Sequence, residues 1–146
     1  MRIISAGLAN TAVTAPAISW LIAQTIKALT DLAIHKKINL RRLFGSGGMP
    51  SSHTAYVVSL TTVVGKLEGV GSPLFAACLA FAMVVMYDAA GVRRAAGKQA
   101  KILNALMSTH FPGEAFNERL MELIGHKPLE VLVGAVFGIA MGAMLG

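Results

Sequence analysis

Apolar residues gather in four segments of the 146-residue chain, and most of its charges fall between them. A bilayer core is crossed by about 20 mostly apolar helical residues. The third segment, "PLFAACLAFAMVVMYDAA", is the clearest candidate for such a helix. The pattern therefore predicts an all-α polytopic membrane helix bundle of about four spans, near residues 8–34, 52–66, 73–90 and 129–146.

The second segment is short for a complete crossing. Its fifteen residues reach about 22 Å as a helix, less than the roughly 30 Å hydrocarbon core. We expect this helix to be partly sunk, re-entrant or shielded by its neighbours.

The polar stretch 91–128 begins with a different helical pattern. Apolar positions recur at spacings of three, four and seven between Val92 and Leu106, and the basic side chains fall on the other side. This periodicity predicts a basic amphipathic helix suited to the headgroup region of the bilayer.

The fourth segment carries a glycine at every fourth position. On a helix these residues share one face and allow a second helix to approach closely. We expect a packing surface, either inside the bundle or in a homodimer, formed by Gly134, Gly138, Gly142 and Gly146.

Composition supports a membrane protein. Hydrophobic residues make up 55% of the chain and charged residues 14%, whereas soluble domains carry roughly 25% charged residues. In this class the formal charge of +6 indicates cytoplasmic loops that face anionic lipids, and we expect no nucleic-acid partner. The length suits a single membrane-embedded domain over residues 1–146.

The loop charges predict the orientation of the chain. Ten of the thirteen basic residues lie in the loops after the first and third segments. With four spans these loops share one side, which should be cytoplasmic, and both termini should lie outside an inner or plasma membrane. The first apolar run is not a compact signal sequence, so we expect it to be retained; it is broken by Asn10, Thr11, Gln24 and Lys27.

Two histidines stand where the second and fourth segments begin, His53 in "MPSSH" and His126 in "GHKPLE". Both starts face the side of the basic loops, and helix N-termini bind phosphate through free N–H groups and a partial positive charge. Glu130 shares a helix face with His126 and can hold one imidazole nitrogen while the other serves as base or nucleophile. Ser51 or Ser52 can cap the second helix. Each motif alone is typical of an ordinary helix start, but together they predict a phosphate site.

Asp88 ends the third segment, where an acidic residue is costly and is usually paired. Its nearest partners in the sequence are Arg93 and Arg94, and a structural ion pair and a functional one both fit this pattern. The first basic loop either binds phosphate or only sets the topology.

The motifs together resemble the type 2 phosphatidic acid phosphatase superfamily, in its divergent branch of small membrane proteins. "PSSH" at residues 50–53 is similar to the second signature, usually Pro-Ser-Gly-His, and "GHKPLEVLVG" at 125–134 is similar to the third. The stretch "YDAAGVRRAAGKQAKILN" at 87–104 also resembles this branch, so the likeness covers nearly the whole chain.

This resemblance implies a role for each matching residue. His126 would be the nucleophile, Glu130 its orienting carboxylate and His53 the proton donor to the leaving group. The phosphate would be bound by polar and basic residues, of which the candidates are Lys37, Arg41, Arg42, Ser51, Ser52, Arg93 and Arg94. The family implies no cofactor and no metal ion.

Several positions depart from the family pattern. Ser52 replaces the usual glycine and Glu130 the usual aspartate. Leu120 stands where the third signature has arginine, with Arg119 one position away. The nearest match to the first signature lacks its proline and consists of Lys37 with Arg41 or Arg42.

The leading hypothesis is a membrane phosphatase that hydrolyses a lipid phosphate or diphosphate on the cytoplasmic face through a phosphohistidine. The altered signatures motivate an alternative, a non-catalytic binder or transporter of a phospholipid or polyprenyl phosphate. A structural membrane subunit that uses its glycine face is a third possibility.

Overall fold

The computed structural model describes residues 10–36, 48–110, 120–122 and 124–146. Within these ranges the chain is helical and contains no strand, which confirms the all-α membrane bundle. The elements are α2 (Thr11–His35), α4 (Ser52–Glu68), α5 (Pro73–Tyr87), the π-turn η1 (Asp88–Val92), α6 (Arg93–His110) and α7 (Pro128–Leu145).

Polar residues fix where these helices begin. The side chains of Asn10, Ser51 and Ser72 each accept a hydrogen bond from a backbone N–H in the first turn of α2, α4 and α5 respectively. Glu130 accepts from the backbone N–H of Lys127 at the start of α7, at 3.1 Å. These caps satisfy N–H groups that the helices leave without an internal partner.

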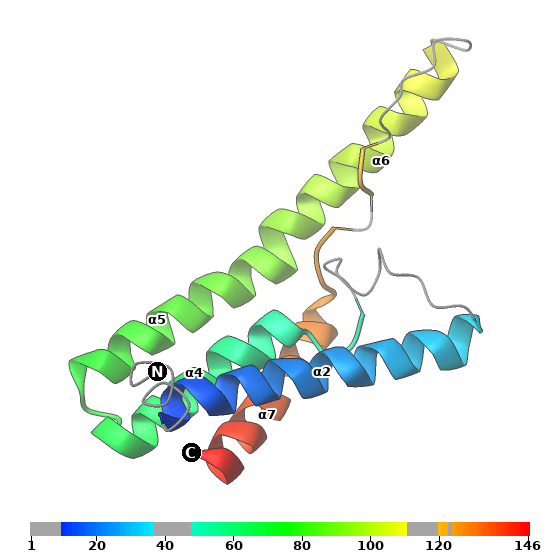
Figure 1. Cartoon of the computed structure of the whole chain (residues 1–146). Helices are drawn as coiled ribbons and strands as arrows, with labels where there is room; N and C mark the ends of the chain where they lie inside the picture. Colours follow the sequence, from blue (N-terminus) through cyan, green and yellow to red (C-terminus); the bar gives the residue numbers. More distant parts are fainter. Residues whose placement is uncertain (1–9, 37–47, 111–119, 123) are drawn as a thin grey trace, which may run out of the picture.

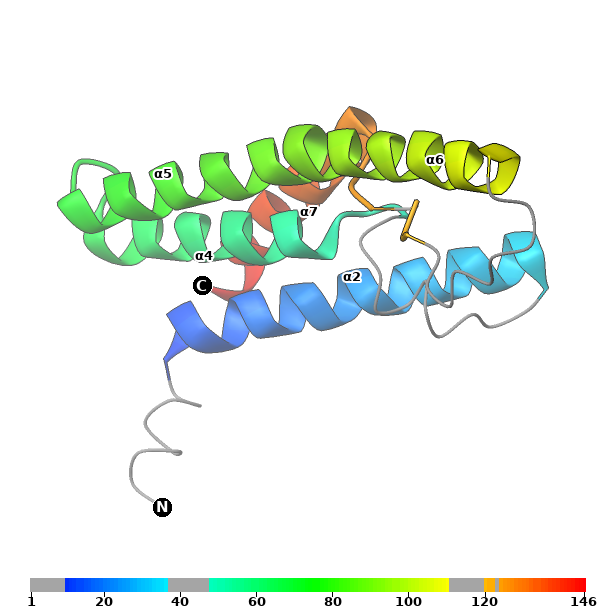
Figure 2. The same cartoon turned by 90° about the horizontal axis from the view of Figure 1, so that it is seen from above.

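Helix α4 is the central element of the bundle. It contacts α2, α5 and α7, and both views show it between α2 and α5 (Figures 1 and 2). Its hydroxyls join the neighbours, since Thr61 Oγ1 donates to the Cys78 carbonyl of α5 at 3.2 Å and Ser19 of α2 donates to the Ala55 carbonyl at 3.3 Å. Hydrogen bonds between helices are typical of packing inside a membrane bundle.

The glycine face of α7 packs against α4. A Cβ added to Gly134 would lie 2.6 Å from the Ser51 carbonyl oxygen, and one added to Gly138 would lie 2.8 Å from that of Ala55. The contacts advance by four residues on both helices, so α4 and α7 run parallel and in register. The glycine face therefore packs inside the bundle, one of the two alternatives expected for it, and nothing in the described part of the chain supports a homodimer through it.

The third segment forms one continuous helix with the basic stretch that follows it. From α5 through η1 to α6 the helix continues without a break, and its far end projects from the bundle (Figure 1). The portion Pro73–Thr109 has 37 residues, about 55 Å of helix, so it exceeds the roughly 30 Å hydrocarbon core. The predicted amphipathic segment is therefore a helix, but it extends α5 instead of forming a separate element.

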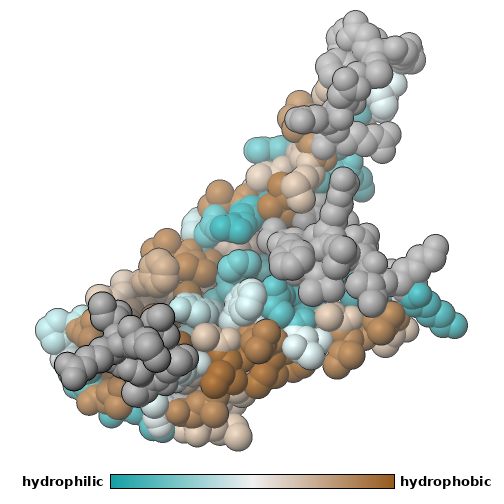
Figure 3. All heavy atoms as spheres, viewed as in Figure 1, coloured by the Kyte–Doolittle hydropathy of each residue, from teal (hydrophilic) through white to brown (hydrophobic). Residues whose placement is uncertain are grey.

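Three described helical stretches are long and apolar enough to cross a membrane, Thr11–Ala33, Pro73–Thr109 and Pro128–Leu145. The 17-residue α4 is not among them, in line with the short second segment. Large apolar side chains face outward on these helices, including Leu21, Phe81 and Leu132, each more than half exposed. Figure 3 shows apolar side chains along the outer faces of α2 and α5, which suits contact with lipid.

Substituting Gly138 tests the α4–α7 contact. Alanine favours a helix over glycine by about 1 kcal/mol, yet its methyl group would lie 2.8 Å from the Ala55 carbonyl and 3.0 Å from Val58 Cβ. We expect Gly138→Ala to lower the free energy of unfolding in detergent by about 1–3 kcal/mol. The control Ala140→Val, at an exposed position of the same helix, should have little effect. An unchanged stability of Gly138→Ala would contradict this packing.

Candidate functional site

The starts of α4 and α7 lie against each other. The Ser51 N–H donates to the Glu130 carbonyl at 3.1 Å, and Gly134 sits directly over Ser51. At the other end, Lys66 Nζ donates to the Ala143 carbonyl at 2.8 Å. The parallel packing therefore brings together the two helix starts that carry His53 and His126, and their positive dipole ends point to one place.

His126 is held in a single orientation. Its Nδ1 lies 3.0 Å from Glu130 Oε2, and its backbone N–H donates to the Ala89 carbonyl of the π-turn at 2.9 Å. The residue is 3% exposed, and within the described ranges its Nε2 has no hydrogen-bond partner. A carboxylate on Nδ1 favours the N–H there and leaves a lone pair on Nε2.

The segment before His126 returns along α6. Gly125 has a φ of +94°, and a Cβ there would lie 2.4 Å from the Arg94 nitrogen, so only glycine fits. Further out, Asn104 donates to the Leu120 carbonyl and to the Glu122 carboxylate, at 2.9 and 2.8 Å. This close contact with α6 places His126 beside the π-turn.

The two serines expected to contact an anion are buried beneath the helix start. Ser51 accepts hydrogen bonds from the backbone N–H of Thr54 at 3.4 Å and from its hydroxyl at 3.0 Å. Ser51 is 0% and Ser52 3% exposed, and neither side chain lines the pocket that opens beside His53 and His126. The cap on Ser51 is confirmed, and the contact of either serine with phosphate stays a prediction.

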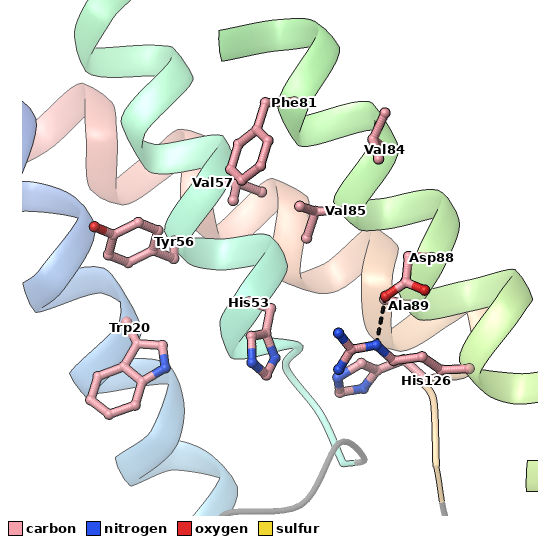
Figure 4. A pocket seen from close by; sticks show the side chains of 11 residues that line it. Trp20, His53, Tyr56, Val57, Phe81, Val84, Val85, Asp88, Ala89 and His126 are labelled. Atoms are coloured by element: carbon pink, nitrogen blue, oxygen red, sulfur yellow. Dashed lines mark hydrogen bonds and ion pairs between the residues drawn. The ribbon is translucent and has the colours of Figure 1, made fainter.

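A pocket of about 520 Å³ opens beside the two histidines (Figure 4). One end carries the ionisable side chains of His53, Asp88, Arg93 and His126. The remaining wall is mostly apolar and is drawn from α2, α4, α5 and the π-turn, through Trp20, Tyr56, Val57, Phe81, Val84, Val85 and Ala89.

Asp88 pairs with one of its two expected partners. Arg93 Nε lies 2.5 Å from Asp88 Oδ2, and both residues line the pocket. Arg94 is exposed and does not line the pocket. The other proposed phosphate ligands, Lys37, Arg41 and Arg42, lie outside the described residues.

Lys27 is a candidate that sequence reasoning missed. It is 6% exposed, its side chain packs against the backbone of Gly48 just before "MPSSH", and its charge acts on Glu130 and on His53. The sequence signal was a lysine inside an apolar span, which is costly and usually functional. Within the described ranges no three potential metal-binding side chains gather.

Comparison with known proteins supports one family. The model of the divergent PAP2 family matches residues 8–141. The chain is 39% identical to the uncharacterized membrane protein YuiD of Bacillus subtilis (strain 168) over 137 residues, which cover 86% of this chain and 87% of that protein. No solved structure matches the chain.

The match covers both helix starts, the π-turn and the pocket between them, and it agrees with the resemblance of the two histidine motifs. This integral membrane protein belongs to the divergent PAP2 family.

Proposed function

We propose that the protein is a membrane phosphatase that hydrolyses a lipid phosphate or diphosphate through a phosphohistidine. The observation that carries this proposal is His126, buried with Nδ1 on Glu130 and with Nε2 lacking a partner among the described residues. A buried nitrogen without a hydrogen bond is costly, and a ligand in the adjoining pocket would satisfy it.

In the first step His126 Nε2 attacks phosphorus. The N–P bond forms as the bond from phosphorus to the lipid oxygen breaks, and protonated His53 gives its proton to that oxygen. In the second step His53 takes a proton from water, the resulting hydroxide attacks phosphorus, and the N–P bond breaks to release phosphate. Glu130 keeps the ring in place and stabilises the positive charge it gains.

Positive groups surround the position where the phosphoryl group would lie. Arg93 lines the pocket, Lys27 adds a buried charge close to His53, and two helix N-termini meet there. Charge on the transferring phosphoryl oxygens is stabilised by such fixed groups, which supply most of the catalysis in phosphoryl transfer.

The pocket favours an amphiphilic substrate. Its ionisable end would bind a phosphate, while the wall beside it is mostly aromatic and aliphatic, with the Tyr56 hydroxyl and the Trp20 indole N–H as its polar groups. A hydrocarbon chain attached directly to the phosphate matches this division. The substrate class is therefore a lipid phosphate, whose chain would lie along Tyr56 and Phe81.

Replacing His126 tests the reaction. We expect His126→Ala to reduce phosphate release from phosphatidic acid or farnesyl diphosphate in mixed micelles by at least about 1,000-fold, because no nucleophile remains. His53→Ala should also lower turnover strongly. The control Gln99→Ala changes an exposed side chain of α6 outside the pocket and should retain activity. Full turnover by His126→Ala would refute the mechanism.

A non-catalytic binder or transporter is the second candidate, favoured by the altered family signatures. The only tryptophan of the chain, Trp20, lines the pocket and can report binding without turnover. We expect dodecyl phosphate to change its fluorescence at lower concentration than dodecanol does, since only the phosphate engages the ionisable end. Binding without phosphate release across the lipid panel would favour this second function, and equal responses to both compounds would contradict a phosphate site.

We also propose that the site faces the cytoplasm, with both termini outside. The protein for this test carries Cys78→Ser together with either Gly71→Cys, before α5, or Lys98→Cys, on α6. An impermeant maleimide should label the first from outside intact cells and the second only after the membrane is opened. The reverse labelling pattern would place the site on the other face.

A further inference from the structure

The ion pair between Asp88 and Arg93 depends on the π-turn. In an α-helix, neighbours on one face are three and four residues apart, so residues five apart do not meet. In η1 the Arg93 N–H donates to the Asp88 carbonyl, five residues back, and this wider turn brings the two side chains together. Arg93 is thereby fixed to Asp88 through both its backbone and its side chain.

The π-turn also holds His126. The Ala89 carbonyl, one residue after Asp88, accepts the His126 N–H at 2.9 Å. A single irregular turn therefore sets the position of the buried histidine and of the arginine that lines the same pocket. Figure 4 shows Asp88 and His126 at the same end of the pocket, with the ion pair of Asp88 as a dashed line.

The geometry of the ion pair leaves the terminal nitrogens of Arg93 available to a ligand. Asp88 accepts from Nε, and within the described ranges no hydrogen bond is found to the two terminal nitrogens of Arg93. The side chains of Arg93 and Asp88 are 48% and 37% exposed, and ion pairs with such exposure contribute little to stability. Orientation of the guanidinium is thus a better explanation for the pair than stability of the fold.

We infer that Asp88 is a positioning residue that, through the π-turn, directs the terminal nitrogens of Arg93 at a phosphoryl group bound between His53 and His126. This inference rests on the proposed phosphate site and adds to it a residue that acts only through Arg93. Arg93 would form two parallel hydrogen bonds to phosphate oxygens, the geometry in which arginine surpasses lysine.

A double-mutant cycle measures the dependence of Asp88 on Arg93. With phosphatidic acid as substrate, we expect Arg93→Ala to lower kcat by about 100-fold or more. Asp88→Asn should lower kcat by about 10- to 100-fold through misplacement of the guanidinium, with a rise in KM that matches its weaker binding of phosphate, and Asp88→Glu should retain more activity. The double variant should be no worse than Arg93→Ala. Losses that multiply in the double variant would overturn the inference.

Exchanging the two charges separates positioning from a structural ion pair. The combination of Asp88→Arg with Arg93→Asp can restore the pair but places a carboxylate where the phosphate needs a cation. We expect its thermal stability to match the unmodified protein and its turnover to remain as low as that of Arg93→Ala. Recovery of turnover would show that the pair itself is what matters. The control Lys98→Ala removes an exposed cation of α6 and should change neither property.

A binding measurement keeps this inference distinct from the phosphatase proposal. Dodecyl phosphate is titrated against the unmodified protein and the same variants, with Trp20 fluorescence as the signal. Asp88→Asn should weaken binding in the presence of Arg93 and have no further effect in Arg93→Ala. If the unmodified protein binds dodecyl phosphate without hydrolysing any lipid phosphate, the phosphatase proposal fails and these affinities alone decide the role of Asp88. Equal weakening by Asp88→Asn in both backgrounds, or no phosphate-dependent binding at all, would overturn the inference about Asp88.

Discussion

The close contact between α4 and α7 is the constraint on which the rest of the structure depends. Glycine at every fourth position of α7 lets its backbone approach Ser51, Ala55 and Ser59 of α4. The absence of side chains on this face sets both the short separation and the register, because a shift by one to three residues would place a larger side chain against the carbonyls of α4. With the register fixed, the two helix starts coincide, and His53 and His126 reach the same pocket.

The π-turn is a second constraint on the position of the same site. If the long helix formed by α5, η1 and α6 were α-helical throughout, its backbone would be regular where it passes the site. The π-turn interrupts that regularity, turns the Ala89 carbonyl toward the chain that returns at His126, and brings Asp88 beside Arg93. Irregular helical turns carry an energetic cost and are frequent at functional sites. The turn thus connects a helix that projects from the bundle to the buried His126.

The position of α4 among its neighbouring helices explains how polar groups are tolerated inside an apolar protein. Four hydroxyl-bearing residues are buried on α4, namely Ser52, Thr54, Ser59 and Thr61, and its N-cap Ser51 is a fifth. Neighbouring helices cover α4 on several sides, so its polar face meets protein instead of lipid. This shielding is what a short helix at membrane depth requires, and the buried Lys27 belongs to the same polar interior.

The sequence by itself determined the helical membrane class, the approximate helix bounds, the glycine face and the pairing of His126 with Glu130. These features depend on composition, periodicity and contacts four residues apart, which are local. It left the partner of the glycine face open between a helix of the same bundle and a second copy, and the tertiary structure places α4 on that face. The burial of Lys27 beside Gly48, the selection of Arg93 over Arg94 and the anchoring of His126 to Ala89 were decided only by the tertiary structure. Each of these depends on how distant segments pack or on one irregular turn, and neither leaves a periodic signal in the chain.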